Sequence, residues 1–188
     1  AFYFLPEDSL LSGNFDHDSL TYDNFNKKVG RLAAGLLQVG IKKGKRVVVF
    51  APISPELYLS IAGLQRIGAI PVLLDSWSRK EQMAEILQNS QPSGIIAPSA
   101  WLKMFADKLN IFGIKIRIST KGNTAEKGVF QINNLLKGKA QNIVPVQQTD
   151  TALITYTTGS SGAPKGANRT HCFLAAQHYA LKRLFPYQ

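Results

Sequence analysis

The chain has 188 residues, of which 45% are hydrophobic and 18% charged, a composition typical of a globular protein and not of a disordered one. This length can bury one good core, so we expect one domain or part of a larger one. The formal net charge of +10 would suit an anionic partner, but the lysines and arginines are scattered and no nucleic-acid-binding motif occurs. We therefore expect no nucleic acid among the partners.

Neither a membrane span nor a secretory leader is predicted. No stretch approaches the roughly 18 continuous apolar residues of a span, and the opening "AFYFLPEDS" lacks a basic segment. The single cysteine, Cys172, excludes an internal disulfide framework and favours a reducing compartment, so we expect the cytoplasm. His17 and His178 have no partners at metal-ligand spacing, so no metal site is predicted.

Helix signals and strand signals alternate from residue 21 onward. Thr21 is suited to cap a helix whose apolar residues recur at helical spacing, and Gly40 is suited to end it. The β-branched run "RVVVF" at 46–50 predicts a strand covered on both faces. Ser54 caps the next predicted helix, and Gly68 ends it.

The same alternation continues to residue 118. In order, we predict a strand at 70–75, a helix opened by a capping box at Ser78 and Glu81, a strand at 93–97, a helix at 100–108 and a strand at 114–118. Residues 119–150 are polar, with one helical turn predicted at 132–136. Strands alternating with helices imply parallel pairing, so the predicted fold is an α/β three-layer sandwich with a mainly parallel sheet flanked by helices.

The last strand is predicted at 152–156. A loop rich in glycine and hydroxyl groups follows it. In open α/β sheets ligands bind beyond the carboxyl ends of the strands, where glycines let backbone N–H groups approach a phosphate. The candidate phosphate-binding residues are Thr157, Thr158, Gly159, Ser160, Ser161, Gly162, Lys165 and Gly166. Thr170 is suited to cap a final helix at 171–184.

Two better-known phosphate loops do not match this segment. Counted from Gly159, Lys165 has the spacing of a Walker A lysine. However, Pro164 replaces the second glycine, and Gly166 replaces the hydroxyl residue that would bind magnesium. No Gly-x-Gly-x-x-Gly occurs, so a dinucleotide fingerprint is absent as well.

The segment "YTTGSSGAPKGA" resembles the phosphate-binding signature of the acyl-adenylate-forming superfamily, which includes acyl-CoA synthetases, peptide adenylation domains and luciferases. The usual wording is an aromatic residue, Thr-Ser-Gly-Ser-Thr-Gly, any residue, then Pro-Lys-Gly. Thr158 stands for the first serine and Ser161 for the second threonine, and both exchanges keep a hydroxyl. The upstream segments "LTYDNFNKKVGRLAAGLLQVGIKKGKRVVVF" and "SPELYLSIAGLQRIGAIPVLLD" are also similar to the family, in the right order.

The resemblance implies that residues 1–188 are the N-terminal portion of the large adenylate-forming domain. Family members join a carboxylate to ATP, with magnesium, to give an acyl-adenylate and pyrophosphate, and most pass the acyl group to CoA or a carrier thiol. Donors at 157–162 would stabilise the departing pyrophosphate, and Lys165 would be a mobile electrostatic contact. The rest of the large domain and a small C-terminal domain with the catalytic lysine would lie elsewhere, so no catalytic residue is assigned here and this segment alone is expected to be inactive.

The acyl substrate and two alternatives stay open. The stretch "LLDSWSRKEQMAEILQNSQPSGIIAPSA" is more similar to the acyl-CoA ligase branch, including its β-lactone-forming members, than to the amino-acid branch. A medium- or long-chain acid is therefore the expected substrate. The alternatives are a truncated relative that binds a nucleotide without catalysis, and an unrelated α/β phosphate-binding protein or kinase.

Several single residues receive structural roles in preference to chemical ones. We expect His171 to cap or pack against the final helix, Cys172 to be a small core residue and Asp75 to cap its loop. We expect Trp77 and Trp101 to be packing residues and Arg169 to be a surface residue.

Overall fold

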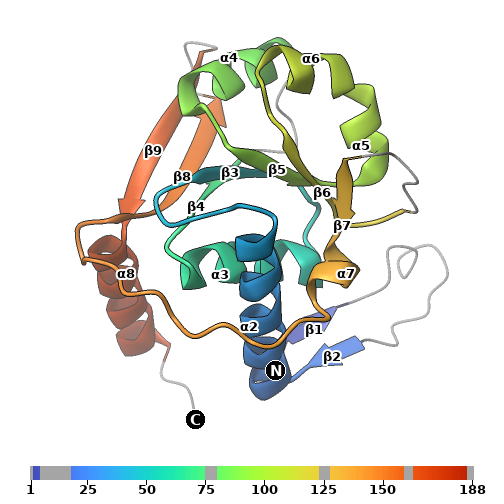
Figure 1. Ribbon diagram of the computed structural model, residues 1–188. Coiled ribbons are helices and arrows are strands. Elements are labelled where there is room, and N and C mark those ends of the chain that lie inside the picture. Colours follow the sequence, from blue (N-terminus) through green and yellow to red (C-terminus); the bar gives the residue numbers. More distant parts are fainter. Residues whose placement is uncertain (1, 5–17, 75–79, 123–127, 159–162, 186–188) are drawn as a thin grey trace, which may run out of the picture.

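The computed structural model describes residues 2–4, 18–74, 80–122, 128–158 and 163–185 (Figure 1). Within them a seven-stranded sheet has the order β7-β6-β5-β3-β4-β8-β9, and every neighbouring pair is parallel except β8 and β9. Its strands are β3 Arg46–Val49, β4 Ile70–Leu73, β5 Gly94–Ala97, β6 Ile116–Ser119, β7 Val129–Gln131, β8 Thr151–Thr158 and β9 Pro164–Thr170. The predicted α/β fold with a mainly parallel sheet is confirmed.

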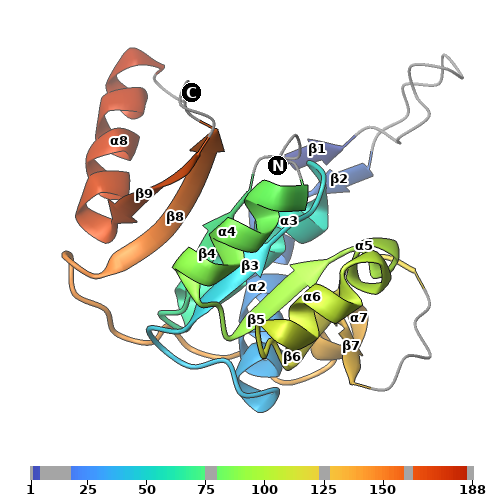
Figure 2. The ribbon, with the colours of Figure 1, turned by 90° about the horizontal axis from the view of Figure 1, so that it is seen from above.

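Helices cover both faces of this sheet (Figures 1 and 2). One face carries α2 Tyr22–Gln38, α3 Pro55–Arg66 and α7 Ile132–Leu135, and the other carries α4 Lys80–Ser90, α5 Ser99–Met104 and α6 Ala106–Ile111. Along β3, Val47 and Val49 belong to the apolar cluster under α2 and α3, whereas Val48 belongs to the cluster under α4, α5 and α6. This alternation explains why a continuous β-branched run suits a strand with two buried faces.

The predicted helix boundaries of the first two helices are confirmed by their caps. Thr21 Oγ1 accepts the backbone N–H of Asn24 at 3.2 Å, and Ser54 Oγ accepts that of Leu57 at 3.4 Å. Gly40 lies just beyond α2 with φ +99°, a conformation that favours glycine. The capping box predicted at Ser78 and Glu81 falls on residues whose side chains lie outside the described part of the chain.

Other elements differ from the sequence-based expectation. The helix predicted at 100–108 is two short helices, because Phe105 (φ −106°, ψ 11°) ends α5 and begins α6. The sequence did not predict β7 or β9, nor the separate antiparallel pair of β1 Phe2–Phe4 with β2 Asp18–Leu20. The three-residue strands among these are too short to show a period of two.

Residues 137–150, which we call the strap, run from α7 across α2 and α3 to β8 (Figure 1). The backbone N–H of Gln141 donates to the Gly30 carbonyl at 2.7 Å, and that of Val144 donates to the Arg66 carbonyl at 2.9 Å. Arg66 Nε in turn donates to the Gln141 carbonyl at 2.7 Å. The strap therefore has no regular structure but is fixed to both helices.

Asp150 closes the strap immediately before β8. Its Oδ2 accepts the backbone N–H of Gln147 at 2.9 Å and lies 3.6 Å from Lys43 Nζ. The Gln147 N–H, followed by the charge of Lys43, holds the pKa of the Asp150 carboxyl below its ordinary value. The ionised carboxylate thus stabilises the folded state.

We expect Asp150→Asn to reduce the free energy of unfolding in a pH-dependent way. Because the folded pKa is lowered, the contribution of the carboxylate is fully present above the ordinary value of 3.8 and is lost as the pH falls through the folded value. Urea titrations from neutral pH downward should therefore show the difference between wild type and variant shrinking toward zero below about pH 3.8. A difference that stays constant across this range would contradict the role given to Asp150.

Candidate functional site

Strand β8 extends beyond the carboxyl end of its parallel neighbour, β4. Leu73, the last residue of β4, pairs with Thr155, so β8 continues for three further residues, to Thr158. The antiparallel strand β9 returns beside it, with Thr157 opposite Lys165. Figure 2 shows this hairpin, with α8 (His171–Leu184) beside it, standing to one side of the main sheet. The end of β8 and the start of β9 therefore lie at the edge where α/β folds bind ligands.

The structure describes part of the predicted phosphate-binding set. Gly159, Ser160, Ser161 and Gly162 lie outside the described residues, and Thr158 ends β8. Thr157 and Lys165 are both exposed and are cross-strand partners. A hydroxyl and an ammonium group presented side by side are a suitable pair of donors for an anion.

Gly166 has a packing role that the sequence did not reveal. It lies opposite Tyr156, and a Cβ on Gly166 would be 3.0 Å from Tyr156 Cζ. The half-buried Tyr156 packs against the apolar cluster under α4, α5 and α6, and this partial burial raises the pKa of its phenol. The ring of Tyr156 thus covers the backbone of Gly166, an arrangement found where a cross-strand aromatic shields a strand glycine.

We expect Gly166→Ala to cost about 1–2 kcal/mol of unfolding free energy, because the new methyl group must displace the Tyr156 ring. In a Tyr156→Val background the same change should cost about 1 kcal/mol less, measured as a double-mutant cycle in urea. Gly138→Ala is the matched control, because an added Cβ there meets nothing within 4 Å. Equal costs of Gly166→Ala in the two backgrounds would contradict this packing.

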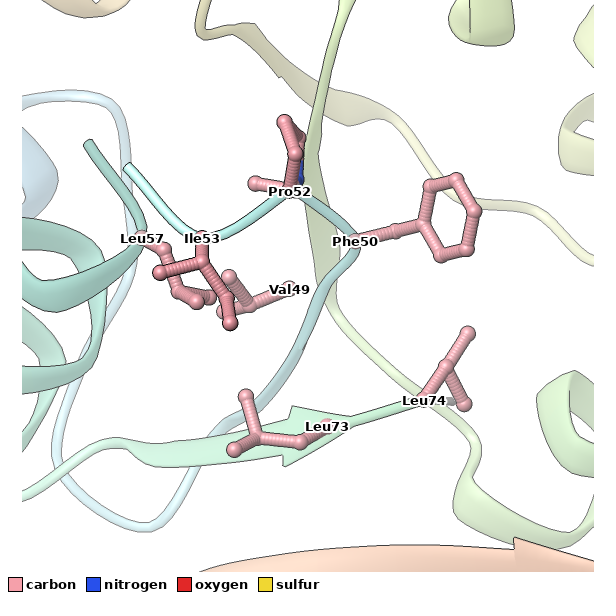
Figure 3. Close-up of a pocket in the computed structure, with 8 residues that line it drawn as sticks. Val49, Phe50, Pro52, Ile53, Leu57, Leu73 and Leu74 are labelled. Carbon is pink, nitrogen blue, oxygen red and sulfur yellow. The ribbon is translucent and has the colours of Figure 1, made fainter. Parts of the chain in front are cut away.

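An apolar cavity of about 410 Å³ opens at the carboxyl ends of β3 and β4 (Figure 3). It is lined by Val49, Phe50, Ala51, Pro52, Ile53, Leu57, Leu73 and Leu74. In the close-up, Val49, Ile53 and Leu73 gather on one side, while Phe50 and Leu74 point to the other. Because β8 is the next strand after β4, the cavity and the hairpin share one edge of the sheet. The volume is within the range of small-molecule pockets.

Sequence reasoning missed this cavity. The signal was that apolar residues continue past Phe50, the last residue of the predicted strand, into "API" at 51–53. Ile53 is 83% exposed, which is unusual for a large aliphatic side chain next to a core strand.

The single-residue predictions have mixed outcomes. Trp101 is a packing residue as expected, with its ring centroid 5.0 Å from that of Phe50 and 4.3 Å from that of Phe105. The prediction that Cys172 is a core residue is wrong, because Cys172 is exposed on a helix with no buried residue in its described length. Asp75 and Trp77 lie outside the described residues.

The start of α8 is organised by packing and capping. Thr170 Oγ1 accepts the N–H of Phe173 at 3.1 Å, which confirms the predicted cap. The backbone N–H of His171 donates to the Asp150 carbonyl at 3.1 Å. The guanidinium of Arg169 lies 4.7 Å from the ring centroid of Phe173, so Arg169 contacts the helix and not only solvent.

The described residues contain neither a metal-binding cluster nor a membrane-spanning helix. No group of three or more histidine, cysteine, aspartate or glutamate side chains there is arranged to hold a metal ion. Among the helices in that part of the chain, none is both long enough and apolar enough to cross a membrane.

The model of one protein family, described as AMP-binding enzyme, matches residues 5–187. That match covers nearly the whole chain. The chain belongs to the AMP-binding enzyme family. The resemblance to the acyl-adenylate-forming superfamily, stated above on the hairpin motif and the two upstream segments, is thereby confirmed.

Relatives of this AMP-binding chain are similar over most of its length. It is 30% identical over 173 residues to an olefin β-lactone synthetase of Xanthomonas campestris pv. campestris, covering 90% of this chain and 31% of that protein. It is 28% identical over 157 residues to a crotonobetaine/carnitine–CoA ligase of Escherichia coli, covering 80% and 30% of the two chains. The solved structure of a long-chain-fatty-acid–CoA ligase from Archaeoglobus fulgidus has a TM-score of 0.78 at 26% identity and covers 87% and 32%. The chain thus spans about a third of the length of these relatives.

Proposed function

We propose that the whole polypeptide is an ATP-dependent acid ligase that activates a carboxylate as an acyl-adenylate, releases pyrophosphate and transfers the acyl group to CoA or a carrier thiol. The observation that carries this proposal is the family match over residues 5–187, together with the exposed cross-strand pair of Thr157 and Lys165 beyond the carboxyl end of β4. The names of the relatives, two of which are acid–CoA ligases, agree with it.

In the proposed reaction the main obstacle is charge. An anionic carboxylate must approach the α-phosphorus of an anionic triphosphate, and the pyrophosphate that leaves carries further charge. Backbone N–H groups and hydroxyls at 157–162 would donate to the β- and γ-phosphates, and exposed Lys165 would add a cation from the opposite strand. A magnesium ion, when bound, would neutralise part of the phosphate charge.

We further propose that residues 1–188 form the N-terminal part of the large domain and are inactive alone. Two observations support this proposal: the chain spans about a third of its relatives, and α8 has no buried residue among those described. On and just after this helix, Tyr179 is 69%, Leu184 is 71% and Phe185 is 67% exposed, as expected of a surface that further chain covers.

The proposed substrate is a fatty or other acyl acid. The support is the resemblance to the acyl-CoA ligase branch and the names of the relatives, which are ligases that join an acid to CoA. The proposed compartment is the cytoplasm, because a chain with one cysteine suits a reducing environment.

The test is an ATP–pyrophosphate exchange assay with magnesium and a series of carboxylic acids of increasing chain length. We expect exchange with the full polypeptide and at least one acid, and none above background with residues 1–188. Nucleotide binding by the full polypeptide without exchange would favour a non-catalytic binding module. Release of ADP in place of AMP would favour a kinase and overturn the proposal.

A further inference from the structure

Four basic side chains surround a depression of about 520 Å³ between α2 and the strap. Lys27 and Arg31 come from α2, where a spacing of four places them on one face, and Lys137 and Lys139 come from the start of the strap. The depression lies next to α7, which follows the edge strand β7, whereas the hairpin forms the opposite edge of the sheet. It is therefore separate from the proposed nucleotide site.

The two basic elements are held firmly together. The N–H of Gln141 donates to the carbonyl of Gly30 at 2.7 Å, in the turn of α2 that carries Arg31. A Cβ on Gly30 would lie 2.9 Å from Ala140 Cβ of the strap. Just before the strap, a Cβ on Gly35 would lie 2.6 Å from the carbonyl oxygen of Leu135, the last residue of α7. Because the two segments are in such close contact, the fold fixes the backbone positions from which these basic side chains extend.

The charge around this depression is poorly balanced within the described residues. Lys27 pairs with Asp23 at 2.6 Å, and the structure records no ion pair there for Arg31, Lys137 or Lys139. Solvent screens isolated exposed charges, but cations that converge on one concavity repel one another until an anion occupies it. A guanidinium fork flanked by ammonium groups matches the geometry and charge of a phosphate.

We propose that this depression, lined by Lys27, Arg31, Lys137 and Lys139, binds the phosphate group of an anionic ligand. A soluble phosphate compound and a phospholipid headgroup present the same chemistry, and the experiment below distinguishes these two sources. The site does not depend on the proposed ligase activity.

The test is the rate at which individual lysines of the full polypeptide are acetylated by a soluble reagent, followed by mass spectrometry. One arm adds inorganic tripolyphosphate, and the other adds phosphatidylcholine vesicles with or without phosphatidic acid. In at least one arm Lys137 and Lys139 should react about tenfold more slowly at saturation, whereas exposed Lys42 and Lys103 keep their rates. The arm that protects the two strap lysines identifies the source of the phosphate.

A pair of variants, each of which removes one cation, shows whether the protection comes from this depression. Arg31→Gln should weaken the ligand affinity, read from the same two lysines, by about tenfold, because it removes a charge-assisted hydrogen bond. Lys103→Gln removes an exposed cation from α5 and should leave the affinity unchanged. Protection in neither arm, equal slowing of all four lysines, or equal effects of the two variants would overturn the proposal.

Discussion

Replacing Thr157 and Thr158 together by valine is expected to lower kcat for adenylate formation by the full polypeptide by about 100-fold or more. Valine keeps the β-branched shape and strand preference of threonine and replaces the hydroxyl by a methyl group. Loss of one preorganised donor at a site of developing charge costs roughly 100- to 1,000-fold in other enzymes. Steady-state pyrophosphate release with saturating ATP and acid measures this effect.

The same strand supplies a matched control. Thr151 and Thr155 also belong to β8 but lie before the point where the strand passes the end of β4. Their double replacement by valine should leave kcat within about twofold, because surface and strand changes of this kind rarely exceed about 0.5 kcal/mol. If both double variants lose activity equally, the hydroxyls at the hairpin tip have no special role.

Leu36→Ala is expected to destabilise the chain by about 3 kcal/mol. Leu36 is fully buried on α2, in the cluster that joins this helix to α3 and the sheet. Truncating a buried leucine removes its transfer free energy and leaves a cavity, which together cost roughly 2–5 kcal/mol. Urea unfolding of residues 1–188, followed by circular dichroism, gives the value.

Leu181→Ala is the matched control for this stability measurement. Leu181 is 45% exposed on α8, so in residues 1–188 its truncation should cost less than about 1 kcal/mol. In the full polypeptide we expect a larger cost, because the proposed remainder of the large domain would cover this helix. Similar losses for the two leucines in residues 1–188 would contradict the assignment of α2 to the core and of α8 to an uncovered surface.

Elements with strong local signals could be predicted from the sequence. The helix that begins at Tyr22 combined a capping threonine, apolar residues at helical spacing and a terminal glycine, and its start is within one residue of the expected position. The strand that begins at Arg46 was recognisable because a β-branched run suits a position between two helical layers. In both cases local preference and tertiary packing favour the same structure.

The remaining elements depend on contacts between distant residues. The segment "PKGANRT" contains proline and glycine and has no strand pattern, and it becomes β9 because it pairs with β8 over its whole length. The basic depression depends on the strap lying against α2, more than 100 residues earlier in the chain, a contact that no local pattern indicates. Cys172 is exposed because no other described segment buries any residue of α8, whereas its apolar neighbours in the sequence suggested a buried position.

The central claim is that the hairpin formed by β8 and β9 holds the triphosphate of ATP. A crystal structure of the full polypeptide with a non-hydrolysable ATP analogue and magnesium tests this claim most directly. We expect the β- and γ-phosphate oxygens within about 3 Å of backbone N–H groups and hydroxyls between Thr157 and Gly162, with Lys165 Nζ directed toward them. A triphosphate bound at another edge of the sheet, with no donor from this hairpin, would contradict the account.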